Sequence, residues 1–80
     1  MKHKILKYTV IYEPAEEGGY VVRIPTLGAA TQGETMEEAQ LMAKECIEAN
    51  IIGLQELGEE IPIEPENVLT AHTSVTLQFA

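Results

Sequence analysis

The sequence contains no Asp, so its 13 acidic residues are all Glu. Only five Lys and Arg residues oppose them, and the formal net charge at pH 7 is −8. A protein that binds the phosphate backbone of a nucleic acid needs clustered Lys and Arg, so the composition argues against direct binding of nucleic acid. An acidic surface suits a basic protein partner, because it accelerates the encounter. The alternative is that the charge serves only to keep the protein in solution.

Cysteine and long apolar runs are equally scarce. The single cysteine, Cys46, excludes an internal disulfide. The apolar pair Ile5 and Leu6 is followed at once by Lys7, so the basic N-terminus does not lead into the core of a signal peptide. No apolar run approaches the ~20 residues that a membrane-spanning helix needs. The sequence therefore predicts a cytoplasmic protein that does not bind a membrane.

Groups suited to catalysis are few. A metal-dependent nuclease needs clustered carboxylates, including acids on strands, but the first predicted strand offers Lys7 and Thr9 instead. The two histidines, His3 and His72, are isolated, and no Ser/His/acid or Cys/His spacing is evident. Cys46 lies in the middle of the apolar stripe of the predicted helix, so we interpret it as a small core residue. The sequence predicts no catalytic residue, no metal site and no cofactor, and hence a protein that is not an enzyme.

The transition from strand to helix is the clearest structural signal. Thr35 suits an N-cap whose hydroxyl accepts the N–H of Glu38, while Glu38 reaches back to the N–H of Thr35. The apolar helical pattern then runs from Met36 to Leu57, and Gly58 is a natural stop. Met36, Leu54 and Leu57 belong to the stripe that we expect to face a sheet.

Alternating apolar residues predict strands over residues 4–12, 20–24 and 68–80. A short strand over 29–32 is expected because a meander must carry the chain to the start of the helix. A Gly18-Gly19 turn joins the first two. The predicted fold is α+β with the order β-β-β-α-β, in which one long helix packs on a small, mostly antiparallel sheet. Residues 1–80 form one domain, whose modest core leads us to expect a homo-oligomer, either a dimer or a tetramer.

Two surface regions are candidates for partner binding. Leu41 and Ile52 lie on the helix face opposite the core, in one strip with Glu48. Glu16 and Glu17 form an acidic turn between the first two strands. Isolated exposed apolar residues are common, however, so the alternative for Leu41 and Ile52 is that they have no role.

Four segments resemble the N-terminal domain of HicB-type antitoxins: Tyr8–Glu13, Gly18–Val22, Thr31–Ala39 and Gly58–Pro62. The resemblance implies a truncated ribonuclease-H-like sheet with one helix. It also implies self-association and the masking of a small basic, HicA-like toxin that cleaves mRNA. Family members often carry an additional DNA-binding domain, which we do not find, so we expect no autorepression by this chain alone. The alternative function is that of a solitary structural or regulatory homo-oligomer with no toxin.

Overall fold

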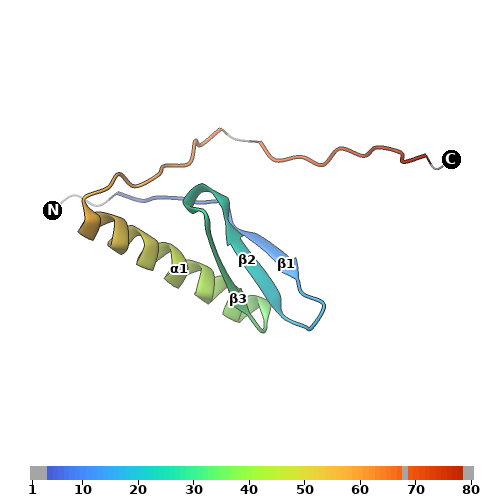
Figure 1. Cartoon of the computed structure of the whole chain (residues 1–80), viewed down its shortest axis with the longest axis horizontal. Helices are drawn as coiled ribbons and strands as arrows, with labels where there is room; N and C mark the ends of the chain where they lie inside the picture. The colour runs from blue at the N-terminus through green and yellow to red at the C-terminus, as the bar shows by residue number, and fades with distance from the viewer. Residues whose placement is uncertain (1–3, 68, 79–80) are drawn as a thin grey trace.

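A computed structural model describes residues 4–67 and 69–78 of the chain (Figure 1). Its elements are strand β1 (Ile11–Pro14), strand β2 (Tyr20–Ile24), the 3-10 helix η1 (Pro25–Leu27), strand β3 (Ala29–Gly33) and helix α1 (Met36–Leu57). The strands form one antiparallel sheet in the order β1-β2-β3, and α1 packs on one of its faces. The α+β class and the order of these elements confirm the sequence prediction.

The β1–β2 turn forms as its glycines predict. Gly18 and Gly19 have φ angles of 100° and 73°, in the left-handed region that favours glycine. Pairing continues through Pro14, which lies opposite Tyr20. Pro14 is therefore the last paired residue of β1 and not part of the turn. Proline is compatible with this position because β1 is an edge strand.

Helix α1 has the bounds that the sequence predicts. The Thr35 hydroxyl accepts the Glu38 N–H at 3.1 Å, as expected. The reciprocal bond differs, because the Glu38 carboxylate accepts the N–H of Glu34, at 3.2 Å, rather than that of Thr35. At the other end Gly58 adopts φ 70°, its N–H donates to Gln55, and the N–H of Glu59 donates to Leu54. These two bonds form a Schellman motif, which satisfies the last carbonyls of the helix.

The fully buried core is small and lies to one side of the sheet. It consists of four residues: Val22, Ile24, Ala39 and Ala43. Helix α1 packs mainly against β3 and β2, and it contacts β1 much less. Small residues at the contact allow the helix to approach closely, and buried Gly33 lies directly beneath the first helical turn. The inner face of β1 is consequently left partly uncovered.

The helix stripe is buried only in its middle. Met36 is 37% exposed and Leu57 is 74% exposed, so the prediction that these ends face the sheet is wrong. At the C-terminal end the reason is length, because a 22-residue helix spans ~33 Å, about twice the reach of a five-residue strand. Cys46 is half-buried against the core, and the Asn50 side-chain amide donates to its carbonyl oxygen at 2.9 Å.

Two predicted strands differ from the structure. The first, predicted over 4–12, pairs only from Ile11, because β2 ends at Ile24 and η1 turns the chain away. The last, predicted over 68–80, is not formed in residues 69–78, which extend away from the body (Figure 1). Val68, Phe79 and Ala80 lie outside the described residues. The radius of gyration, 16.2 Å, reflects this extension, since ~12 Å is typical of a compact 80-residue domain.

Gly53 provides a prediction about stability. A Cβ placed on it would meet no atom within 4 Å, so nothing in the described chain requires glycine inside the helix there. We expect Gly53→Ala to raise the free energy of unfolding by about 1 kcal/mol, because alanine has the higher helix propensity. Urea unfolding followed by circular dichroism measures the change. A loss of stability instead would indicate that another backbone approaches Gly53.

Candidate partner-binding surface

The β1–β2 turn lies against the turn that leads into α1. A Cβ placed on Gly19 would lie 2.6 Å from the carbonyl oxygen of Gly33 and 3.2 Å from the Cα of Glu34. The sheet register explains this proximity, because Tyr20 and Gly33 are partners at the end of the β2–β3 ladder. The two turns therefore meet at one end of the molecule.

This end of the molecule is acidic. Its two turns and the first helical turn carry five exposed glutamates: Glu16, Glu17, Glu34, Glu37 and Glu38. Sequence reasoning selected Glu16 and Glu17 but did not join them to the three others, because the joining contact is made by the strand register. We call this set the acidic end. The positive end of the helix dipole offsets part of its mutual repulsion and allows the carboxylates to gather there.

The other predicted residues lie on one strip of α1. Leu41 and Ile52 are 56% and 54% exposed, and Glu48 is also exposed. Spacings of seven and four residues place Leu41, Glu48 and Ile52 along one side of the helix, and Glu37 of the acidic end lies four residues before Leu41 on the same side. The strip thus continues the acidic end along the helix. Together the two present carboxylates and separate apolar side chains to solvent, which is the composition that a basic protein surface could contact.

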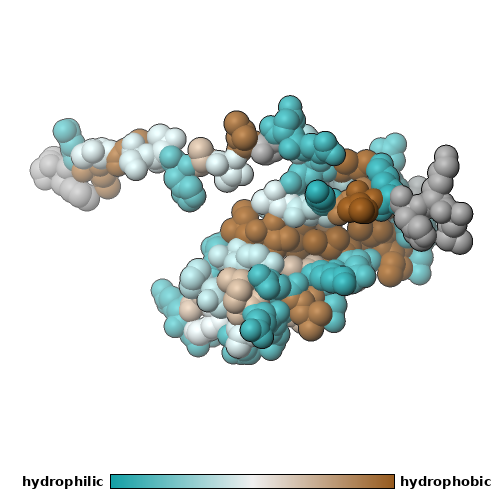
Figure 2. All heavy atoms as spheres, turned by 180° about the vertical axis from the view of Figure 1, so that it is seen from behind, coloured by the Kyte–Doolittle hydropathy of each residue, from teal (hydrophilic) through white to brown (hydrophobic). Residues whose placement is uncertain are grey.

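A groove opens beside this strip, between α1 and residues 4–12. It has a volume of about 790 Å³. Apolar residues from both walls line it: Leu6, Tyr8, Val10, Tyr12, Ala43, Ile47, Ile51 and Ile61. Figure 2 shows hydrophobic side chains gathered in a band on the body of the molecule. Leu6, Tyr8, Val10 and Tyr12 share one face of residues 4–12, and the groove lies between this face and α1.

The three charged residues that line this groove are all exposed to solvent. Lys4 and Lys44 line it together with Glu48, so Glu48 belongs both to the helix strip and to the groove.

On the outer face of the sheet, Arg23 donates to the Glu13 carboxylate at 2.6 Å, and both side chains are more than half exposed. That pair contributes little to stability, because solvent screens it.

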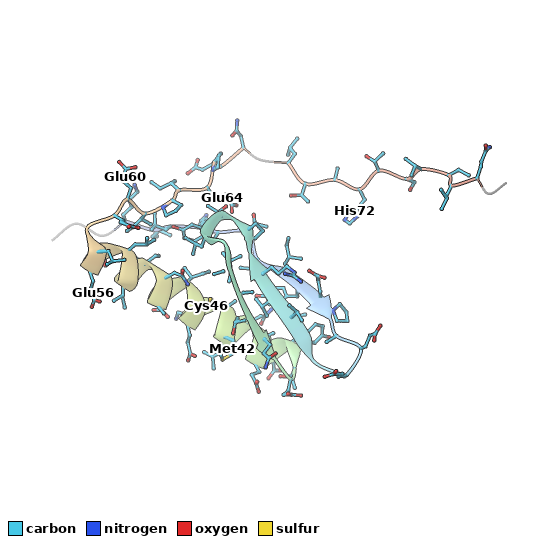
Figure 3. The ribbon with its side chains drawn as sticks, in the orientation of Figure 1. Met42, Cys46, Glu56, Glu60, Glu64 and His72 are labelled. Atoms are coloured by element: carbon cyan, nitrogen blue, oxygen red, sulfur yellow. The ribbon has the colours of Figure 1, made fainter. Side chains whose placement is uncertain are left out.

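Glu64 ties the connector after α1 to the rest of the fold (Figure 3). Its carboxylate accepts the backbone N–H of Thr9 at 2.8 Å, the Thr9 hydroxyl, and the Thr26 hydroxyl at 2.8 Å. Tyr8 adds a bond from its hydroxyl to the carbonyl oxygen of Pro62 at 2.7 Å. Hydrogen bonds from Thr9 and then Thr26 hold the pKa of Glu64 below its ordinary value. No local sequence pattern marks Glu64 for this role.

The lowered pKa of Glu64 gives a prediction about pH. A carboxyl group whose pKa is lower in the folded state stabilises that state above its ordinary pKa, and the stabilisation is lost as pH falls through the folded value. We expect the Thr9 amide proton to report this titration by NMR, with a midpoint below 4.5. Glu64→Gln should abolish the transition. A midpoint at or above 4.5, or a transition that survives in the Gln variant, would contradict the three bonds.

The described residues offer no metal-binding cluster, since no three of their His, Cys or Glu side chains gather suitably. Among the helices of that same part of the chain, none has the length and apolar character required to cross a membrane.

Comparison with known proteins places the chain in a family, although no family model matches it. A UPF0150 protein of Thermoplasma acidophilum is 44% identical over 68 residues, which cover 84% of this chain and 99% of that protein. A UPF0150 protein of Synechocystis is 36% identical over 73 residues, 90% of either chain.

The antitoxin HicB 1 of Photorhabdus laumondii is 43% identical over 78 residues. These cover 96% of this chain and 50% of the antitoxin, so the chain spans about half the length of that relative. The resemblance seen in the strand, turn and helix-start segments is thereby confirmed across nearly the whole sequence. The chain belongs to the family of HicB-like antitoxins and UPF0150 proteins.

Proposed function

We propose that the chain is an antitoxin-type binding module that masks a small basic, mRNA-cleaving toxin by protein–protein contact. The observation that carries this proposal is the 43% identity to the antitoxin HicB 1 over 78 residues. The distribution of charge supports it, because the acidic end gathers five exposed carboxylates where two turns meet.

The mechanism that we propose is occlusion. A toxin that cleaves RNA needs a cationic site for the phosphate backbone. Carboxylates of Glu16 and Glu17 would take the place of phosphate at that site, while Leu41, Glu48 and Ile52 extend the contact along the helix. Binding, rather than catalysis by this chain, is then the basis of activity. Such a contact requires the acidic end to be open to solvent, as it is in the structure.

Co-purification tests this function. A tagged version of the chain is recovered from its native cells, and the bound fraction is identified by mass spectrometry. We expect a small basic protein that is toxic when expressed alone and harmless when this chain is co-expressed. Recovery of only the chain itself, from cells shown to express a neighbouring basic reading frame, would contradict the proposal.

A second function is favoured by one observation. The UPF0150 protein of Thermoplasma acidophilum is matched over 99% of its own length, so a domain of this size occurs as a separate protein. The chain could then be a solitary structural or regulatory homo-oligomer. Absence of a basic reading frame beside its gene would favour this alternative, whereas its presence would favour the antitoxin.

A further inference from the structure

Residues 69–78, which we call the tail, have the pattern of a half-buried strand but no partner in the structure. Leu69, Val75 and Leu77 are 94%, 88% and 74% exposed. They share one face with Ala71 and Thr73, while the other face carries only polar side chains: Thr70, His72, Ser74, Thr76 and Gln78. Within the described residues, no backbone group of the tail is hydrogen-bonded to another part of the chain. Figure 3 shows His72 on the tail, away from the body.

The composition of this region is not that of a solvated tail. Segments that stay disordered have low hydrophobicity and many charges. No Lys, Arg or Glu occurs after Glu66, although 22% of the chain is charged. An exposed strand that is apolar on one face and uncharged invites aggregation unless another surface covers it. The pattern therefore indicates that another surface covers residues 69–78 when the protein functions.

The groove between α1 and residues 4–12 exposes apolar walls, which an apolar segment would cover. Residues 4–10 belong to no strand ladder, and Lys4, Leu6, Tyr8 and Val10 among them line the groove. The row from Leu6 to Tyr12 spans ~20 Å as an extended chain, and the apolar face of the tail, from Leu69 to Leu77, spans ~26 Å. The charged residues that line the groove are Lys4, Lys44 and Glu48. They would face no charged side chain of the tail, because the tail contains no Lys, Arg or Glu.

The tail of the same chain is poorly placed to fill this groove. Tyr8 contacts Pro62 and Thr9 contacts Glu64, so the connector runs parallel to the first segment with an offset of 54–55 residues. Residues 69–78 then run away from α1 and from residues 4–12, which form the walls of the groove (Figure 1).

We propose that two copies of this chain exchange their tails, so that residues 69–78 of each lie in the groove of the other. Leu69, Val75 and Leu77 of each tail pack against the apolar walls of the other copy's groove. Exchange of an identical element is a low-cost route to a twofold dimer. Each copy contributes ten tail residues and the 13 residues that line its groove, which is the usual size of one side of a stable interface, about 20–30 residues.

Paired charge substitutions on the two faces of the tail test this exchange. Val75→Glu with Leu77→Glu places two carboxylates against the groove, whereas Ser74→Glu with Thr76→Glu adds the same charge to the polar face. We expect the first pair to raise the dimer dissociation constant at least tenfold and the second to change it by less than threefold, measured by analytical ultracentrifugation. A monomeric native chain, or equal effects of the two pairs, would overturn the exchange.

Crosslinking tests the place of the tail directly. Chains with Val75→Cys and chains with Ile51→Cys, both with Cys46→Ser, are mixed under reducing conditions and then oxidised. We expect a disulfide between unlike chains, which Ser74→Cys in place of Val75→Cys should not form. If the unlike chains fail to crosslink, or if a chain carrying both cysteines crosslinks only within itself as a monomer, the tail is not exchanged.

Discussion

Replacing Gly33 with alanine is expected to lower the free energy of unfolding by about 3 kcal/mol, through overpacking beneath the helix. A Cβ at this position would lie 2.5 Å from the backbone nitrogen of Ala39, 2.6 Å from its Cα and 3.0 Å from the carbonyl carbon of Glu38. All three are backbone atoms, so no side chain can rotate away. Relief requires β3 and α1 to separate, which opens the contact that buries Ala39.

The expected loss is a large part of the total. A domain of this size has a stability of roughly 4–12 kcal/mol, so the variant should be substantially less stable and partly unfolded on mild heating. Gly53→Ala is the matched control, because the same atoms are added in open space and should stabilise the helix. Urea unfolding of both variants gives the comparison. If Gly33→Ala and Gly53→Ala both change the free energy of unfolding only slightly, helix α1 does not pack against β3 as closely as in the structure.

Reversing charge at the β1–β2 turn is expected to weaken binding of a basic toxin at least tenfold. Glu16→Lys with Glu17→Lys changes the net charge by four and places cations where the toxin's own cations approach. Most of the loss should appear in the association rate, because rim charges steer encounter. It should shrink as salt is added, since exposed charges are screened. Surface plasmon resonance at two salt concentrations measures both effects.

The matched control carries the same change of charge at the far end of the helix. Glu56→Lys with Glu59→Lys alters exposed residues that lie ~30 Å from the start of α1 along its axis. We expect less than a threefold change there. Leu41→Ser and Ile52→Ser should mainly raise the dissociation rate of the complex, because they remove apolar side chains that the toxin would cover. If the two charge pairs weaken binding equally, only the net charge matters, and the acidic end is not the contact surface.

Local chemistry accounts for what could be predicted from the sequence. Helix α1 has its predicted bounds because Thr35, Glu38 and Gly58 specify both ends through neighbouring groups. The Gly18-Gly19 turn is similarly local. The strand prediction over 4–12 was too long because pairing depends on where β2 ends, which is decided by η1 rather than by residues 4–10 themselves.

The features that sequence reasoning missed depend on contacts between distant segments. Glu64 bonds to Thr9 and Thr26, 55 and 38 residues away, and no local pattern marks it. The acidic end joins two turns through the sheet register. The predicted strand over 68–80 shows a different limit, because alternation reveals that a segment can be a strand but does not identify its partner. Residues 69–78 have the alternating pattern of a strand, but they pair with no strand of the described chain.

Inhibition of RNA cleavage tests the central claim most directly. The small basic protein that co-purifies with this chain is assayed on an mRNA substrate while the chain is titrated against it. We expect complete inhibition at a fixed molar ratio, and we expect the variant with Glu16→Lys and Glu17→Lys to require a much higher ratio. Cleavage that persists with a large excess of the folded chain would contradict the antitoxin function and leave the solitary oligomer as the better explanation.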